Sequence, residues 1–144
     1  MAEIILDRNA LAARVKTLQA AGKRVVFTNG CFDLIHVGHV RYLRGARALG
    51  DVLLLALNSD DSVRRLKGPQ RPLLPLEDRL AVLSAFGMVD LLTAFDEDNV
   101  TPLLLALRPD VHAKGTDYTP YTFPEKDTVA SYGGRVAVVG DPKD

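Results

Sequence analysis

Apolar residues follow two different spacings along this chain, and the two spacings alternate. Stretches with apolar side chains three or four residues apart predict helices, because such residues share one helix face. Short stretches of nearly continuous apolar character predict buried strands, as parallel sheets usually contain. The predicted helices are 9–21, 40–49, 76–86, 99–107 and 124–132. The predicted strands are 24–28, 52–57, 89–95, 111–114 and 135–139.

This alternation indicates the fold class. Strands that alternate with helices form right-handed crossovers, so we expect an α/β fold with a Rossmann-like, doubly wound parallel sheet of about five strands. The segment 67–75 contains Gly68 and several prolines, which predicts a loop. The 144 residues suffice for one core, and no repeat or linker divides them. We therefore expect residues 1–144 to form a single domain.

Composition narrows the classes of partner. The formal net charge is zero, which argues against a general attraction to nucleic acid or to an anionic membrane. Cys31 is the one cysteine in the sequence, so several cysteines cannot share a structural zinc ion, and a reducing cytoplasm fits. Residues 1–7 lack the pattern of a signal peptide, and the longest apolar run, 52–57, is too short to cross a bilayer.

Polar residues follow three of the predicted strands directly. They occupy 29–33, 58–61 and 114–118. The carboxyl ends of parallel strands meet at one edge of the sheet, and ligands bind at that edge in open α/β sheets. We therefore expect these three segments to lie close together and to form the functional site.

The segment from Cys31 to His39 reads C-F-D-L-I-H-V-G-H and joins a predicted strand to a predicted helix. Imidazole groups and backbone N–H groups at a helix N-terminus can bind phosphate oxygens. Gly38, between the two histidines, allows a substrate to approach the backbone closely. The alternatives are two surface histidines or a metal pair, but metal pairs on a helix prefer a spacing of four residues. The strand, turn and helix around the motif favour phosphate binding.

Residues 29–39 resemble the HxGH signature of the cytidylyltransferase-like nucleotidyltransferases. Enzymes of this group transfer a nucleoside monophosphate from a nucleoside triphosphate to a phosphorylated substrate and release pyrophosphate. Further segments resemble the heptose 1-phosphate adenylyltransferases, which make ADP-heptose for the lipopolysaccharide core. These segments are 27–33, 58–60, 65–68, 71–72, 77–79 and 114–118. The resemblance extends from about residue 7 to residue 139.

The resemblance implies a cytoplasmic enzyme that transfers AMP from ATP to heptose 1-phosphate. It implies ATP and a phosphorylated sugar as partners and a homodimer as the assembly. We expect Mg²⁺ on the triphosphate, held mainly by phosphate oxygens and water. Two alternatives stay open: a cytidylyltransferase or adenylyltransferase for another acceptor such as glycerol 3-phosphate, and a non-catalytic nucleotide-binding domain. A metal-dependent hydrolase is disfavoured, because carboxylates and histidines are not clustered at metal-binding spacings.

The resemblance also assigns roles to residues at matching positions. It implies that the catalytic residues are His36, His39 and Lys67. It implies nucleotide contacts from Asn29, Gly30, Cys31, Phe32, His36, Gly38, His39, Lys67 and Arg79. It implies acceptor contacts from Asp33, Asp60, Lys114 and Asp117. No residue is assigned to a protein-held metal ion.

Several of these residues also have a purely structural interpretation. Lys67 can be a solvated loop charge, and Arg79 can pair with a neighbouring acid such as Glu77. Asp33 can order its own loop, and Asp117 can be an ordinary turn residue.

Further structural alternatives concern Cys31, the aspartates after the second strand and an aromatic group. Cys31 can contribute through packing and its backbone. Asp60 or Asp61 can cap the next helix. Tyr118, Tyr121 and Phe123 can line a sugar pocket or a subunit interface.

One departure from the family pattern concerns the end of the chain. Relatives continue past the last strand into a Ser/Thr-rich turn that opens a helix and contacts the nucleotide. This chain stops at residues 140–144, so we expect either that the sequence is cut short there or that the protein lacks this part of the nucleotide site.

Overall fold

The computed structural model describes residues 1–115 and 124–140. Its strands are β1 Glu3–Ile4, β2 Val25–Gly30, β3 Val52–Asn58, β4 Leu91–Phe95, β5 Val111–Lys114 and β6 Arg135–Val138. Its helices are α1 Arg8–Ala20, α2 Val37–Arg47, α3 Asp60–Lys67, α4 Leu76–Ser84, α5 Thr101–Leu107 and α6 Lys126–Ser131. The alternation of strands and helices inferred from the sequence is confirmed.

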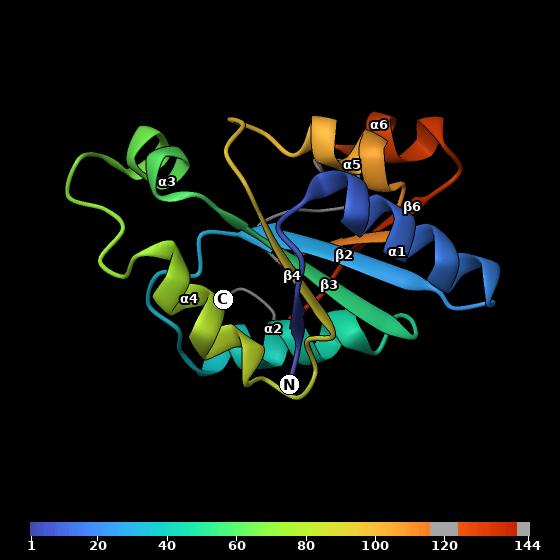
Figure 1. The fold of residues 1–144 in the computed structure, drawn as a ribbon, viewed down its shortest axis with the longest axis horizontal. Coiled ribbons are helices and arrows are strands. Elements are labelled where there is room, and N and C mark those ends of the chain that lie inside the picture. Colours follow the sequence, from blue (N-terminus) through green and yellow to red (C-terminus); the bar gives the residue numbers. More distant parts are fainter. Residues whose placement is uncertain (116–123, 141–144) are drawn as a thin grey trace.

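The strands of the described ranges form one parallel sheet in the order β1-β4-β3-β2-β5-β6 (Figure 1). From β2 the chain moves outward through β3 to β4, and it then returns to place β5 on the other side of β2. Strand order therefore reverses between β2 and β5, the position at which such sheets bind ligands. The Rossmann-like, doubly wound class is confirmed.

Three details differ from the sequence-based expectation. Helix α3 is not among the predicted helices. The sheet has six strands in the described ranges, because the two-residue β1 adds to its edge beside β4. A strand this short carries no readable alternation of side chains. Helix α2 begins at Val37 rather than at residue 40, because the side chain of His36 accepts a hydrogen bond from the N–H of Gly38 and caps the helix.

Helices cover both faces of the sheet (Figure 1). Helices α2 and α4 bury Leu43, Ala46, Leu80 and Leu83 against one face, together with Leu55 of β3. Helices α1, α5 and α6 bury apolar residues against the other face, and these are Leu11, Val15, Leu103, Leu104, Leu107 and Val129. Because both faces are covered, β3 is buried at every position, which explains its uninterrupted apolar sequence.

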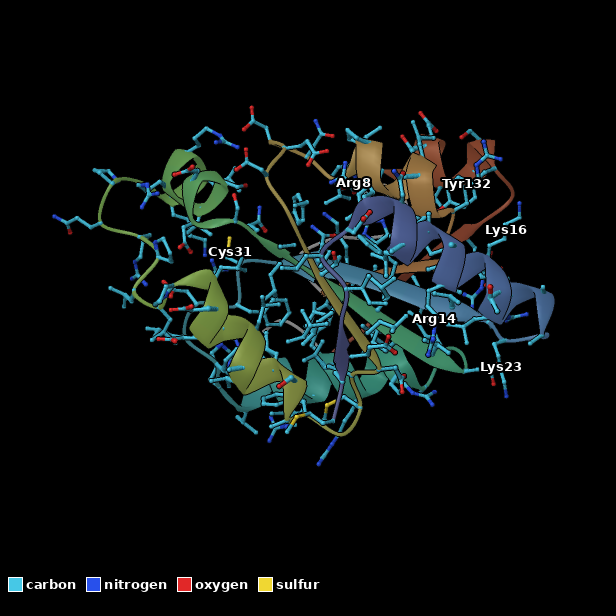
Figure 2. All side chains as sticks on the ribbon, in the orientation of Figure 1. Arg8, Arg14, Lys16, Lys23, Cys31 and Tyr132 are labelled. Carbon is cyan, nitrogen blue, oxygen red and sulfur yellow. The ribbon has the colours of Figure 1, made fainter. Side chains whose placement is uncertain are left out.

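The approach of α2 to the sheet depends on a glycine just after the helix. A Cβ atom on Gly50 would lie 2.8 Å from the carbonyl oxygen of Arg24 and 2.8 Å from Cγ2 of Val26. A larger residue would push the end of the helix away from β2. The close packing sets the position of the helix whose first turn carries His36 and His39. In Figure 2, Cys31 follows the carboxyl end of β2 and lies near α3 and α4, whereas Lys23 lies at the amino end of the strand.

Replacing Leu55 by alanine should lower the free energy of unfolding by about 2–5 kcal/mol, because Leu55 is fully buried and the change leaves a cavity. Urea unfolding followed by circular dichroism measures the loss. The matched control is Leu105→Ala, on the exposed side of α5, which should change the free energy by less than about 0.5 kcal/mol. Equal losses in the two variants would contradict the described core.

Stability should also depend on pH through His112, which is fully buried in β5. Burial, and then the nearby charge of Lys114, lowers the pKa of His112 from 6.5 to about 3. Between these two values the unfolded chain binds more protons than the folded one, so stability is lost as the pH falls below about 6.5.

The variant His112→Leu isolates this effect. Going from pH 7 to pH 5, the variant should lose about 2 kcal/mol less unfolding free energy than the wild type, since each pH unit contributes about 1.4 kcal/mol. Urea titrations of both proteins at the two pH values measure the difference. Parallel losses would show that His112 titrates normally in the folded state.

Candidate functional site

The carboxyl ends of β2, β3 and β5 open into a cavity of about 810 Å³. Asn29, Asn58 and Lys114 line it from the ends of these three strands. The first turn of α2, the end of α3 and the following loop complete the described lining with His36, Gly38, His39, Lys67 and Arg71. The predicted convergence of the strand ends is therefore confirmed for residues 29–33, for Asn58 and for residues 114–115.

His36 and His39 form a reciprocal cap at the start of α2. The Nδ1 atom of His36 accepts from the N–H of Gly38 at 3.0 Å, and Nδ1 of His39 accepts from the N–H of His36 at 3.2 Å. An acceptor nitrogen carries no proton, so each neutral ring holds its proton on Nε2. The ring centroids lie 4.1 Å apart. The cap thus turns both rings into paired N–H donors beside the cavity.

The surroundings of His39 favour an uncharged ring. Burial, and then the neighbouring charges of His36 and Lys67, lower the pKa of His39 below its ordinary value. Gly38 is required for the close ring geometry, because a Cβ atom there would lie 2.8 Å from Cε1 of His36. The small residue between the histidines therefore serves the cap as well as access to the backbone.

Asp33 attaches the loop after α3 to the loop that carries the histidines. Its side chain is 6% exposed and accepts hydrogen bonds from the N–H groups of Leu73, at 2.8 Å, and Leu74, at 2.9 Å. Nη1 of Arg71 lies 3.3 Å from the same carboxylate. Burial alone raises the pKa of Asp33, but these donors outweigh it and the pKa falls below its usual value. The loop-ordering role predicted for Asp33 is confirmed.

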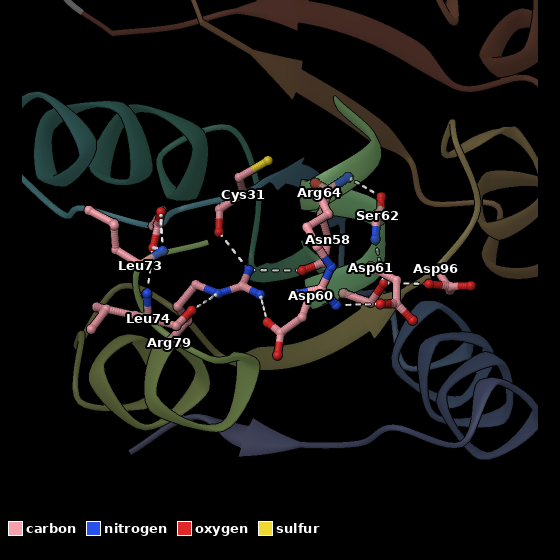
Figure 3. Close-up of polar contacts among 12 residues, drawn as sticks. Cys31, Asn58, Asp60, Asp61, Ser62, Arg64, Leu73, Leu74, Arg79 and Asp96 are labelled. Atoms are coloured by element: carbon pink, nitrogen blue, oxygen red, sulfur yellow. Dashed lines mark hydrogen bonds and ion pairs between the residues drawn. The ribbon is translucent and has the colours of Figure 1, made fainter. Parts of the chain in front are cut away.

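Arg79 connects four segments from inside the protein (Figure 3). Its Nη1 donates to the carbonyl oxygens of Cys31 and Asn58 at 2.8 Å, and its Nε donates to that of Leu74 at 3.0 Å. Its Nη2 lies 2.7 Å from Oδ1 of Asp60. The side chain of Arg79 is fully buried, and all the contacts just described are with other groups of the protein itself.

These contacts correct one interpretation of the sequence. The partner of Arg79 is Asp60 at the start of α3, so the suggested pair with Glu77 is wrong. Glu77 is only two residues away on the same helix and faces elsewhere, whereas α3 approaches Arg79 through the fold. Neither Arg79 nor Asp60 is among the described residues that line the cavity. Their direct contacts with nucleotide and acceptor stay predictions.

Cys31 contributes its backbone carbonyl to Arg79, as the packing interpretation anticipates. Burial raises the pKa of its thiol above the ordinary value, although Lys67 and Arg79 oppose the shift. A thiol that holds its proton is a poor nucleophile. The arrangement therefore assigns Cys31 no covalent step.

The β5 side of the cavity carries an ion pair that the sequence pattern did not indicate. Nζ of Lys114 lies 3.2 Å from Oε1 of Glu125, and both side chains are largely buried. Glu125 precedes α6 and gave no signal beyond an acidic residue near a helix start. Asp117 and the aromatic residues Tyr118, Tyr121 and Phe123 lie outside the described residues.

Other lining residues were also missed. Arg71 and Asn58 lie within longer segments of the family resemblance, and Tyr42 carries no sequence signal of its own. Tyr42 sits one helical turn after the histidine pair, and its hydroxyl donates to the carbonyl of Ala113 at 3.2 Å. Burial raises the pKa of Tyr42 to about 12, so the hydroxyl keeps its proton.

Within residues 1–115 and 124–140, no three His, Cys, Asp or Glu side chains are grouped closely enough to hold a metal ion. In the same ranges no helix is both long and apolar enough to cross a membrane.

Solved structures of other proteins share this fold. The lipopolysaccharide core biosynthesis protein from Thermoplasma volcanium GSS1 is 25% identical and superposes with a TM-score of 0.72, covering 85% of this chain and all of that one (100%). A pantoate-beta-alanine ligase from Francisella tularensis, complexed with Beta-gamma ATP and Beta-alanine, is 14% identical with a TM-score of 0.63, covering 100% of this chain and 68% of that one. The second likeness, at this identity, concerns the fold alone.

Sequence relatives are more similar. The bifunctional protein HldE of Syntrophotalea carbinolica is 54% identical over 132 residues, and that of Pelobacter propionicus is 52% identical over 135 residues. The alignments cover 92% and 94% of this chain but only 27% and 28% of the relatives. This chain thus spans little more than a quarter of their length. The sequence model of the cytidylyltransferase-like family matches residues 27–142, and the chain belongs to that family.

Proposed function

We propose that this protein transfers AMP from ATP to heptose 1-phosphate, which yields ADP-heptose and pyrophosphate. The single observation that carries the proposal is the pair of Nε2–H donors on His36 and His39, held at a helix N-terminus beside the cavity. Similarity to the bifunctional protein HldE and to a lipopolysaccharide core biosynthesis protein supports the choice of acceptor. Adenine as the base rests on the same resemblance.

The chemistry requires no protein nucleophile. A phosphate oxygen of the acceptor is already ionised near neutral pH and attacks the α-phosphorus of ATP in line. The bond from the α-phosphorus to the bridging oxygen breaks, and pyrophosphate leaves with the electron pair. The protein then has two tasks, which are to position the two substrates and to stabilise the charge that develops on the phosphate oxygens.

The described side chains suit the second task. The Nε2–H groups of His36 and His39 donate to oxygens of the α-phosphate, and the cap already orients them before the substrate arrives. Preorganised donors of this kind need no rearrangement during the reaction. Lys67 and Arg71 line the same cavity and supply positive charge for the leaving pyrophosphate. Asp33 holds the loop that carries Arg71.

Mg²⁺ belongs to the proposal as a companion of the triphosphate. Phosphate oxygens and water would hold most of the coordination positions of the ion, as Mg²⁺ prefers. When bound, Mg²⁺ would neutralise part of the triphosphate charge. The proposal also includes the cytoplasm, where charged nucleotides and sugar phosphates are retained, and the homodimer implied by resemblance.

A substrate panel tests the reaction. Purified protein with ATP, Mg²⁺ and heptose 1-phosphate should release pyrophosphate, and mass spectrometry should identify ADP-heptose. The parallel reactions replace ATP by CTP, or replace the acceptor by glycerol 3-phosphate. Turnover only with one of these replacements would contradict the heptose assignment. ATP binding without pyrophosphate release from any mixture would instead favour the non-catalytic alternative.

The histidine pair can be tested separately from the helix cap. His36→Ala and His39→Ala should each lower kcat about 100-fold, as the loss of one transition-state donor typically does. His36→Asn is the matched variant, because asparagine is a good N-cap but lacks the ring N–H donor. It should keep the unfolding free energy near the wild-type value and still lose about 100-fold in kcat. Near-normal rates in these variants would remove the histidines from the mechanism.

A further inference from the structure

His112 reaches from β5 to the end of the neighbouring strand β2, beneath the cavity. Its side chain is fully buried, and its Nε2 lies 3.0 Å from Oδ1 of Asn29. His112 is paired with Phe27 in the parallel register, so Asn29 lies two residues further along β2. The imidazole also packs edge-on against Phe27, with ring centroids 5.1 Å apart. The ring is therefore held from the side as well as through its nitrogen.

The proton on this contact can be assigned. An amide oxygen has no proton to give, so the neutral imidazole of His112 carries its proton on Nε2 and donates it to Oδ1 of Asn29. The ring is neutral at pH 7, because burial lowers the pKa of His112 to about 3. The donor–acceptor direction therefore stays the same across the working pH range of most enzymes.

The contact decides which end of the Asn29 amide is left for a ligand. Asn29 lines the cavity, and its Oδ1 is turned toward His112. Across residues 1–115 and 124–140, no hydrogen bond is formed by Nδ2 of Asn29. Rotation of the amide by about 180° would present Oδ1 to the cavity instead, and an acceptor there would repel a phosphate oxygen.

We propose that His112 is a positioning residue which holds the Asn29 amide with its NH₂ group toward the cavity, so that Asn29 donates a hydrogen bond to an anionic oxygen of the bound nucleotide. The inference rests on the proposed nucleotide chemistry and adds a third donor to those of His36 and His39. His112 itself has no contact with the ligand. Its proposed effect on nucleotide binding passes through Asn29.

A double-mutant cycle tests this dependence. Affinity for ATP in the presence of Mg²⁺, measured by titration calorimetry, should fall about tenfold in Asn29→Ala and in His112→Leu, as expected for one hydrogen bond to a charged group. The double variant should also lose about tenfold, because the amide that His112 orients toward the ligand is absent once Asn29 is replaced. An additive loss of about a hundredfold would overturn the proposal, since a purely structural role of His112 persists without Asn29.

A conservative variant separates orientation from packing. His112→Gln offers a side-chain N–H₂ donor to Oδ1 of Asn29, so it should bind ATP more tightly than His112→Leu. Equal affinities for the two variants would overturn the proposal. The comparison also serves if the leucine variant fails to fold, because the glutamine variant is then compared with the wild type and should lie within threefold of it.

Nitrogen-15 NMR of the ring tests the geometry without any substrate. The wild-type protein at pH 7 should show the proton of His112 on Nε2, and Asn29→Ala should shift that resonance. A ring protonated on Nδ1 alone, or a charged ring, would overturn the proposal. A wild-type protein that binds ATP but transfers no AMP to heptose 1-phosphate would contradict the proposed acceptor. The double-mutant cycle and the NMR measurement would still test the role of His112, because neither uses the acceptor.

Discussion

The buried guanidinium of Arg79 is the interaction on which the architecture of the site depends. It joins the end of β2, the end of β3, the loop before α4 and the start of α3 through Cys31, Asn58, Leu74 and Asp60. A fully buried charge is tolerated only when it is paired and its donors are satisfied. Here the carbonyl groups at two strand ends gain partners at the same time, at the edge of the sheet where the ladder of backbone hydrogen bonds stops. One side chain thus stabilises the frame around the cavity without lining it.

Among the remaining polar groups, too, some hold the frame of the site in place and others face the cavity. Asp33 uses its buried carboxylate to hold a loop, and that loop brings Arg71 to the cavity. Backbone N–H groups occupy Nδ1 of His36 and His39 and leave the Nε2 protons for a ligand. All three histidines of the chain lie at this end of the sheet, and each has a hydrogen-bond partner that determines the position of its proton. In these side chains the protein binds one polar atom, and this determines which polar atom remains for a ligand.

The sequence predicts the fold and the convergence of the strand ends at the cavity, and the reasons are physical. The spacing of apolar residues follows directly from burial, so the sequence predicts the fully buried β3 and the amphipathic helix α2. The rule that ligands bind at the carboxyl ends of parallel strands predicts that Asn29 and Lys114 lie close together. The partner of Arg79 was not readable, because Asp60 lies 19 residues away and approaches only through the packing of α3. The pair of Lys114 with Glu125 and the contact of His112 with Asn29 were missed for the same reason. Contacts between residues from different helices, strands or loops leave no local pattern in the sequence.

The strand order of this sheet has a consequence for how the protein is made. Asn29 and His112 are 83 residues apart, yet their strands are neighbours. A ribosome therefore releases the whole segment from the end of β2 through α3, which includes the histidine pair, long before β5 can pair with β2. Contacts between residues this distant in sequence form slowly, because a long loop must close first. The nascent chain carries its histidine pair for much of its synthesis with one side of β2 uncovered, and the cavity is completed only by the last third of the polypeptide.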